Sequence, residues 1–277
     1  MEAEYNNRAR VPAYPEIMAA WERDAAAYRR ARLRRAELGI PYGQHKRQTI
    51  DLFHADADDE RRPLLIFIHG GYWRSLEPSM FSHFAGGANA RGYPVAVLGY
   101  RLCPEVTLAE IVGDVRAAAL FLHRRMGKRL AACGHSAGGH LTAALVGTEW
   151  RAFGADVPAH LIRHGLTISG VFDLEPLLST SINADLRLDA EGARAMSPAL
   201  WPAPKGVLLE ALVGGEESSE FLRQSHLIVD RWAAGGASTL FSALPGANHF
   251  TAPNPLADPG SGIVDGLVKL LEAAAKV

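Results

Sequence analysis

The sequence predicts an α/β protein in which a mainly parallel sheet is flanked by helices on both faces. From about residue 47 onward, short apolar stretches alternate with longer stretches of helical spacing. Nearly continuous apolar stretches are typical of strands buried on both faces, and their alternation with helices implies parallel pairing. The chain has 277 residues, of which 48% are hydrophobic, so it can bury one large core. We therefore expect residues 1–277 to form a single domain.

The first predicted element is a helix over residues 15–39, within a helical N-terminal extension of residues 1–40. Pro15 suits the first turn of a helix. Apolar residues then recur at helical spacing, namely Ile17, Trp21, Ala25 and Tyr28. The arginines between residues 29 and 35 are interpreted as a solvent-exposed helix face.

Strands and helices alternate along the rest of the chain. Strands are expected at residues 47–55, 63–71, 93–100, 129–135, 165–172, 206–215 and 238–246. Helices are expected at residues 78–91, 107–126, 136–147, 218–234 and 262–275. The connection of about 173–205 is long and irregular, and long connections are often functional lids. We expect it to form a small cap over a site at the carboxyl ends of the strands.

Composition excludes several classes of function. The formal net charge is -1 and the pI is near 6.8, so a nucleic-acid partner is not expected. Cys103 and Cys133 lie in apolar stretches, which favours two buried thiols over a disulfide. The N-terminus lacks an apolar secretory segment, and no apolar stretch approaches the roughly 18 residues of a membrane span. We expect a cytoplasmic protein without a membrane partner.

The stretch Gly134-His135-Ser136-Ala137-Gly138 lies between a predicted strand and a predicted helix. Ser136 would therefore occupy a tight turn, where flanking glycines avoid crowding. This is the nucleophile-elbow arrangement, in which the hydroxyl is lifted above the sheet and the helix N-terminus directs N–H groups at the reacting centre. We predict that Ser136 is a nucleophile, and the alternative is a structural turn.

A second glycine pair follows an earlier predicted strand, in residues 67–73 (FIHGGYW). A serine nucleophile needs donors for the oxyanion of its tetrahedral intermediate. Gly70 and Gly71 allow the backbone to approach that oxygen, and the N–H of Ala137 would be a further donor. His69 precedes the glycines and is expected to organise this loop.

The third stretch, residues 244–255 (LPGANHFTAPNP), follows the last predicted strand and contains His249. A histidine in a late loop is a candidate general base, and the alternative is an exposed loop histidine. His160 and His164 stand four residues apart, as zinc ligands on a helix can. No glutamate follows His160 and no third ligand is evident, so we expect neither a metal nor a cofactor.

The acid of a Ser-acid-His order should lie between the other two residues in the chain. The strand at 206–215 ends next to Glu216 and Glu217, and either carboxylate could accept the imidazole N–H of His249. Asp173, which follows the preceding strand, is a third candidate. The distance from the strand end favours Glu217.

Several motifs together resemble those of the α/β-hydrolases. They are HGGYW at 69–73, YRLCPE at 100–105, GHSAGGH at 134–140 and GGEESSEFLRQS at 214–225. This set is similar to the kynurenine formamidase (arylformamidase) branch, next to the hormone-sensitive-lipase-like esterases, and the resemblance covers roughly residues 40–275.

The resemblance implies a role for each matched residue. Ser136 would be the nucleophile, His249 the base and Glu217 the acid, although many relatives have aspartate at the acid position. The oxyanion hole would be formed by the backbone of Gly70, Gly71 and Ala137.

The resemblance implies acyl transfer to water, and an arylformamidase acting on N-formylkynurenine-like compounds is the leading hypothesis. A carboxylesterase for short-chain or aryl esters is the alternative, and a non-enzymatic binding module is a third hypothesis. Five residues are predicted to contact substrate: Tyr72, Trp73, Asn183, Trp201 and Phe250. For Tyr72 and Trp73 the alternative is core packing, and for Asn183 and Trp201 the alternative, which is favoured, is packing within the cap. The oligomeric state stays open, with a homodimer as one alternative.

Overall fold

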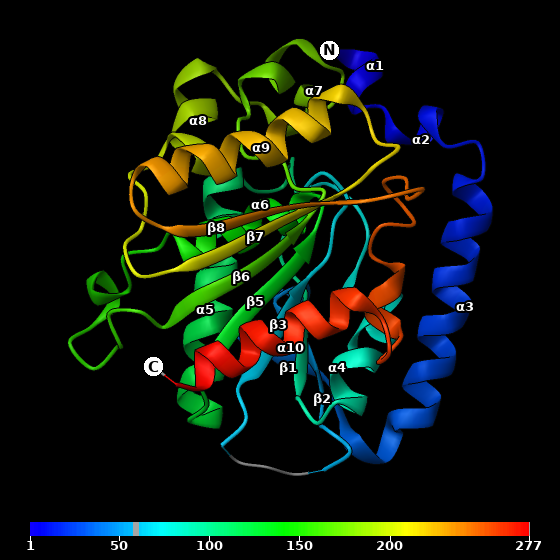
Figure 1. The fold of residues 1–277 in the computed structure, drawn as a ribbon, viewed down its shortest axis with the longest axis vertical. Helices are drawn as coiled ribbons and strands as arrows, with labels where there is room; N and C mark the ends of the chain where they lie inside the picture. Colours follow the sequence, from blue (N-terminus) through cyan, green and yellow to red (C-terminus); the bar gives the residue numbers. More distant parts are fainter. Residues whose placement is uncertain (58–60, 277) are drawn as a thin grey trace.

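The computed structural model describes residues 1–57 and 61–276, and these form an eight-stranded sheet with helices on both faces (Figure 1). The strand order is β1-β2-β4-β3-β5-β6-β7-β8. The strands are β1 (Ala36–Pro41), β2 (Thr49–Phe53), β3 (Leu64–Ile68), β4 (Val95–Leu98), β5 (Leu130–His135), β6 (Ile162–Ile168), β7 (Leu208–Gly214) and β8 (Ser238–Leu244). Strand β2 pairs antiparallel with β1 and β4, whereas all pairs from β4 to β8 are parallel. The predicted mainly parallel α/β architecture is confirmed.

The two faces of the sheet can be followed along β3, because successive side chains of a strand point to opposite faces. Leu64, Ile66 and Ile68 pack into one core with side chains of α5 (Leu108–Met126), α6 (Ala137–Val146) and α9 (Ser219–Ala234). Leu65 and Phe67 pack into a second core with α3 (Tyr14–Arg32) and α10 (Gly262–Ala275). Burial on both faces explains the nearly continuous apolar sequence of the central strands.

The helix predicted over residues 15–39 is wrong at its C-terminal end. Helix α3 ends at Arg32, a 3₁₀ turn follows over Leu33–Arg35, and residues 36–41 form the edge strand β1. Residues 36–39 carry a sequence compatible with a helix, but antiparallel pairing with β2 overrides that local preference. Two short helices precede α3, namely α1 (Glu2–Tyr5) and α2 (Asn7–Arg10).

Other element boundaries also differ from the prediction. The helix expected at 78–91 is a 3₁₀ segment over Pro78–Ala85 followed by α4 (Gly86–Ala90). The strand expected at 165–172 begins and ends earlier, as β6, and residues 169–172 leave the sheet. The connection of about 173–205 contains four short helical segments: Glu175–Ser179, α7 (Asn183–Leu186), α8 (Ala190–Ala195) and Pro198–Leu200.

Cys103 and Cys133 are buried free thiols, as predicted. Burial raises the pKa of the Cys103 thiol to about 11, so it is not a ready nucleophile. Across residues 1–57 and 61–276, we find no helix with the length and apolar character needed to cross a membrane.

Replacing Gly138 with alanine should destabilise the protein by several kcal/mol, on the order of 3 or more, or prevent folding. A Cβ at this position would lie 1.9 Å from the carbonyl oxygen of Ile68, because α6 starts against the end of β3. Gly113, inside α5, is the matched control, since a Cβ there meets nothing within 4 Å. Gly113→Ala should stabilise by about 0.5–1 kcal/mol. Urea unfolding of both variants tests this, and equal stabilities would contradict it.

Candidate active site

Ser136 lies on the sharp turn between β5 and α6. Strand β5 ends at His135 and helix α6 begins at Ala137, so Ser136 is the only residue of the turn. Its backbone has φ 57° and ψ -120°, a conformation that a non-glycine residue adopts rarely and that is found at functional sites. Its N–H donates to the carbonyl oxygen of Ile168 at 2.8 Å, which fixes the turn against β6. The Ser136 residue is 3% exposed, at the floor of a cavity.

His249 reaches Ser136 from the loop after β8. Its Nε2 lies 3.1 Å from the Ser136 hydroxyl oxygen. His135 supports this loop, because its Nε2–H donates to the carbonyl oxygen of His249 at 2.8 Å. Burial and the neighbouring His249 ring hold the pKa of His135 well below its usual value, so His135 is a neutral donor.

Glu217 is the carboxylate that contacts His249. Its Oε2 accepts from Nδ1 of His249 at 2.6 Å, which leaves Nε2 of the same ring free to accept from the Ser136 hydroxyl. The other carboxylate oxygen accepts from the N–H of Gly214 at 2.8 Å and from the hydroxyl of Ser169. Both oxygens are therefore held, and the carboxylate can orient the imidazole.

The two alternative acids lie elsewhere. Glu216 is exposed, and its backbone N–H donates to the carbonyl oxygen of Ala247 at 2.9 Å. Asp173 forms an ion pair with Arg223 at 3.2 Å and does not contact the histidine. The structure thus brings Ser136, His249 and Glu217 together from three strand ends that are more than 30 residues apart in the chain.

Gly70 and Gly71 line the cavity beside Ser136. A Cβ on Gly70 would lie 3.0 Å from the Ser136 Cβ, and Gly71 has φ 110°, so this loop needs glycine at both positions. Ala137 is the first residue of α6, and an N–H at that position has no partner within its own helix. These three residues surround the serine with backbone groups.

His69 organises the loop in front of these glycines. Its Nδ1–H donates to the carbonyl oxygen of Gly70 at 2.7 Å, and its ring stacks between Phe81 and Tyr100. Burial lowers the pKa of His69 to about 3, so the ring is neutral near pH 7. The Tyr100 hydroxyl donates to the carbonyl oxygen of His69 at 2.8 Å and fixes the turn further.

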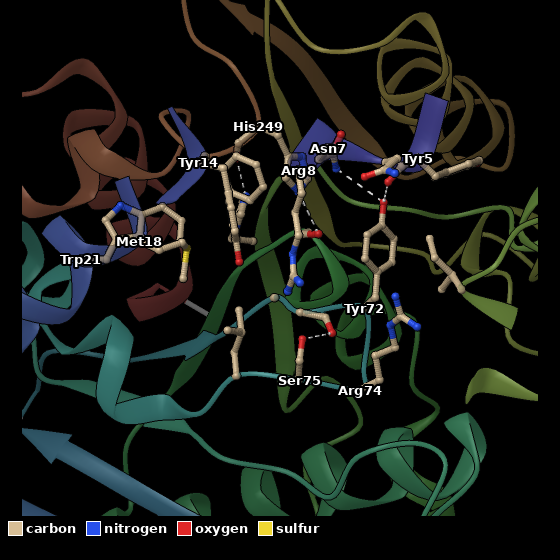
Figure 2. Close-up of a pocket in the computed structure, with 18 of the residues that line it drawn as sticks. Tyr5, Asn7, Arg8, Tyr14, Met18, Trp21, Tyr72, Arg74, Ser75 and His249 are labelled. Carbon is tan, nitrogen blue, oxygen red and sulfur yellow. Dashed lines mark hydrogen bonds between the residues drawn. The ribbon is translucent and has the colours of Figure 1, made fainter. Parts of the chain in front are cut away.

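The cavity above Ser136 has a volume of about 130 Å³ and an aromatic wall (Figure 2). Phe250 packs against Tyr14 and Trp21, at centroid distances of 4.7 and 6.5 Å. Tyr72 lines the cavity as well, and its hydroxyl donates to the carbonyl oxygen of Tyr5 at 2.7 Å. Tyr72 and Phe250, both predicted to contact substrate, therefore line the cavity.

Three predicted substrate contacts are not among the residues that line this cavity. Trp73 is fully buried and packs edge-on against His140 at 5.0 Å, so it is a core residue. Both polar groups of the Asn183 side chain bond the backbone of Leu188, which closes the end of α7. Trp201 lies against α6, and its Nε1–H donates to the carbonyl oxygen of Ala195 at 2.8 Å.

The N-terminal segment of residues 2–21 supplies much of the cavity lining, which no pattern in the sequence indicates. Its contributions are Glu2, Tyr5, Asn6, Asn7, Arg8, Tyr14, Met18 and Trp21. The segment lies at the same end of the molecule as α7 and α9 (Figure 1). Two residues of the connection of about 173–205, Ser181 and Ile182, also line the cavity.

The histidine pair considered as metal ligands is not on a helix. His160 is exposed in a turn, whereas His164 lies on β6 with its side chain mostly buried. Within the described part of the chain, no three His, Cys, Asp or Glu side chains are grouped so as to hold a metal ion.

The chain is similar to several known proteins. The BD-FAE family model matches residues 50–174. The chain is 30% identical to the kynurenine formamidase of Drosophila melanogaster, over 76% of this chain and 73% of that protein. It is 29% identical to the kynurenine formamidase of Salmo salar, over 84% of this chain and 81% of that protein. A solved thioesterase candidate from Silicibacter sp. TM1040 is 33% identical, with a TM-score of 0.86 over 98% of each chain.

The strand order, the turn at Ser136 and these relatives identify the chain as an enzyme of the α/β-hydrolase class, a hydrolase. Within that class, the chain belongs to the kynurenine formamidase family.

Proposed function

We propose that this protein is an arylformamidase, which hydrolyses the formamide of N-formylkynurenine-like compounds through Ser136, His249 and Glu217. The observation that carries the proposal is the hydrogen-bonded chain from the Ser136 hydroxyl through His249 to Glu217, at the floor of an aromatic cavity. The curated relatives with this name support the choice of substrate class.

The proposed reaction begins with attack of the Ser136 Oγ on the formyl carbon. His249 Nε2 takes the hydroxyl proton, and the Glu217 carboxylate stabilises the imidazolium that forms. His249 then protonates the leaving aryl amine as the carbon–nitrogen bond breaks. A water molecule attacks the formyl-serine with His249 again acting as base, and formate and the free serine result.

The backbone N–H groups of Gly70, Gly71 and Ala137 are the proposed donors to the oxyanion. Loss of one donor of this kind typically raises the barrier by about 2.7–4 kcal/mol. The glycine pair supports this assignment, because a side chain at Gly70 would meet Ser136 itself. No metal or cofactor takes part in this mechanism.

The aromatic wall is the proposed binding surface for the aryl ring of the substrate. Tyr14, Trp21 and Phe250 form one continuous aromatic cluster, and Phe250 directly follows the proposed base. Stacking on such rings is worth about 0.5–1.5 kcal/mol beyond area burial. We also propose that the connection of about 173–205 acts as a cap, because Ser181 and Ile182 line the cavity.

Steady-state hydrolysis of N-formyl-L-kynurenine, beside p-nitrophenyl esters with two to eight acyl carbons, tests the proposed function. We expect kcat/KM for the formamide to exceed that of the best ester by about tenfold or more. Release of formate in step with kynurenine would identify the bond that is cleaved. Turnover of short esters with no formate release would instead favour the carboxylesterase alternative. A thioester in the series covers the activity suggested by the Silicibacter protein.

We further propose a cytoplasmic location, a single domain over residues 1–277 and no nucleic-acid or membrane partner. The net charge of -1 supports the absence of a polyanion-binding surface. A homodimer stays a prediction, and sedimentation at micromolar concentration would measure it.

A further inference from the structure

Two arginines line the cavity, and only one of them is committed to a carboxylate of the protein. Arg74 forms an ion pair with Asp185, with 2.6 Å between Nη1 and Oδ2. Among residues 1–57 and 61–276, no carboxylate lies within 4.0 Å of the Arg8 guanidinium. Arg8 instead stands over the Tyr14 ring, with its Cζ 5.1 Å from the centroid. Figure 2 shows its side chain pointing into the cavity beside Tyr14.

Glu2 is an acidic residue that also lines the cavity, and its carboxylate already has hydrogen-bond partners. Its two carboxylate oxygens accept from the N–H and the hydroxyl of Ser181, each at 2.7 Å. These bonds hold the pKa of Glu2 below its usual value, so it remains ionised. Arg8 is therefore the cavity cation that is available to a ligand.

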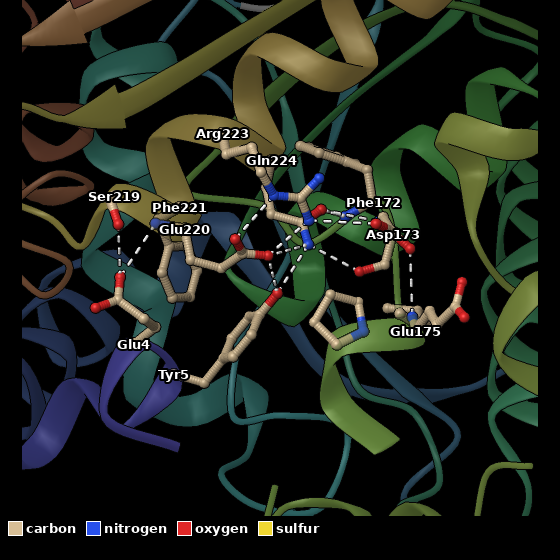
Figure 3. A network of polar contacts seen from close by, with 12 residues as sticks. Glu4, Tyr5, Phe172, Asp173, Glu175, Ser219, Glu220, Phe221, Arg223 and Gln224 are labelled. Atoms are coloured by element: carbon tan, nitrogen blue, oxygen red, sulfur yellow. Dashed lines mark hydrogen bonds and ion pairs between the residues drawn. The ribbon is translucent and has the colours of Figure 1, made fainter. Parts of the chain in front are cut away.

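The backbone that carries Arg8 is fixed by a polar network around Tyr5 (Figure 3). The Tyr5 hydroxyl donates to Glu220 at 2.6 Å and accepts from Gln224 Nε2 at 2.8 Å. Arg223 holds the Glu220 carboxylate in turn, at 2.6 Å. Tyr5 is 1% exposed and is held against the buried face of α9. Because Arg8 follows Tyr5 by only three residues, its backbone is held near α9 as well.

A second set of contacts holds the residues next to Arg8 in the chain. The Asn7 side chain reaches the Tyr72 hydroxyl at 3.5 Å, and Tyr72 donates to the Tyr5 carbonyl oxygen. The Asn6 side chain accepts from the N–H of Ala9 at 3.2 Å and begins the short helix α2. Arg8 thus projects from a segment whose preceding residues are fixed and whose next residue bonds back to Asn6. None of the carboxylates in the described part of the chain pairs with its guanidinium.

We propose that Arg8 binds a carboxylate on the leaving group of the substrate and so selects acidic aryl substrates. The proposal rests on the proposed function, because an aryl ring on the Tyr14–Phe250 wall would place its other substituents near Arg8. A guanidinium offers paired N–H donors that match a carboxylate. N-formylkynurenine has such a carboxylate on the amino-acid group remote from its formamide. This contact is made equally in the ground and transition states, so it acts mainly on KM.

The test compares two formamides in the wild type and in Arg8→Ala. N-formyl-L-kynurenine carries the carboxylate, and 2-formamidoacetophenone has the same aryl ketone without it. We expect Arg8→Ala to lower the ratio of the two kcat/KM values by about tenfold or more, mostly through KM. Arg8→Lys should lose less, because it retains the charge. High salt should lower the wild-type ratio, because exposed charges are screened.

Arg23→Ala is the matched control, since Arg23 is an exposed arginine on α3 that pairs only with its neighbour Asp24. Its substrate ratio should equal that of the wild type. Equal losses on both formamides in Arg8→Ala would indicate a structural role for Arg8 and overturn the proposal. An unchanged ratio would overturn it as well.

A failure of the proposed function is distinguished by a second pair of substrates. If the wild type hydrolyses neither formamide, 4-acetoxybenzoate and phenyl acetate replace them as esters with and without a carboxylate on the leaving group. A tenfold loss of ratio in Arg8→Ala on this pair would support Arg8 as the carboxylate site while the formamidase function fails. The same ratio in both proteins would overturn the Arg8 proposal itself.

Discussion

Ser136→Ala is expected to lower kcat by at least about 10⁴-fold while the protein remains folded. The Ser136 Oγ lies 3.1 Å from His249 Nε2, and alanine offers no atom that can form the acyl-enzyme. The activity that remains would come from backbone donors and substrate binding. Steady-state hydrolysis of N-formyl-L-kynurenine and p-nitrophenyl acetate measures the loss, and both substrates should be affected alike.

A second buried serine provides a control that distinguishes loss of the nucleophile from loss of packing. Ser225, on α9, is fully buried, and Ser225→Ala should keep wild-type activity. A fluorophosphonate should add one label to the peptide that contains Ser136, and this label should be missing in Ser136→Ala only. If Ser136→Ala kept more than about a tenth of the activity, or if the label appeared on another residue, Ser136 could not be the nucleophile.

The turn at Ser136 was predictable because its signals are local. A buried strand, two small residues and a helix start occur within about ten residues, and the glycines at 134 and 138 have direct steric reasons. A Cβ on Gly134 would lie 2.1 Å from the Gly138 carbonyl oxygen. Sequence reasoning works where neighbours in the chain are also neighbours in space.

Strand β1 was missed because its sequence does not specify its structure. Residues 36–41 read AELGIP, with residues that are common in helices followed by glycine and proline. Pairing with β2 makes them a strand, and that partner begins at Thr49, beyond the reach of any local pattern. An edge strand gains less from burial, so its apolar alternation is also weak.

The cavity lining was hidden for a related reason. Tyr5 and Glu220 are 215 residues apart in the chain, and no periodicity relates a short N-terminal helix to the middle of α9. Arg8 lines the cavity although it is an exposed residue, and nothing in the sequence separates it from the other exposed arginines. Conversely, Trp73 follows the glycine loop directly, but its ring turns into the core and packs on His140. The position of a residue next to a motif therefore predicts where its backbone lies better than where its side chain points.

Glu217→Gln should lower kcat by about 10³–10⁴-fold with little change in KM. The carboxylate accepts from His249 Nδ1 at 2.6 Å and is buried, so no solvent replaces its charge when the imidazolium forms. An amide of the same size keeps the packing but removes this charge, and it can present its NH₂ group to the ring and favour the wrong tautomer. The rate of formate release from N-formyl-L-kynurenine at saturating substrate measures the effect.

Glu216→Gln is the matched control, because it makes the same chemical change one residue earlier. The Glu216 side chain is exposed at the strand end, so its loss should change kcat by less than about twofold. Glu217→Asp keeps the charge but shortens the side chain. The decrease in kcat of Glu217→Asp should therefore lie between the decreases of Glu216→Gln and Glu217→Gln. Since the second Glu217 oxygen is held by Gly214 and Ser169, the shorter side chain cannot satisfy both sets of partners. If Glu216→Gln were the more damaging change, the acid would have to reach His249 in a different arrangement of the loop after β7.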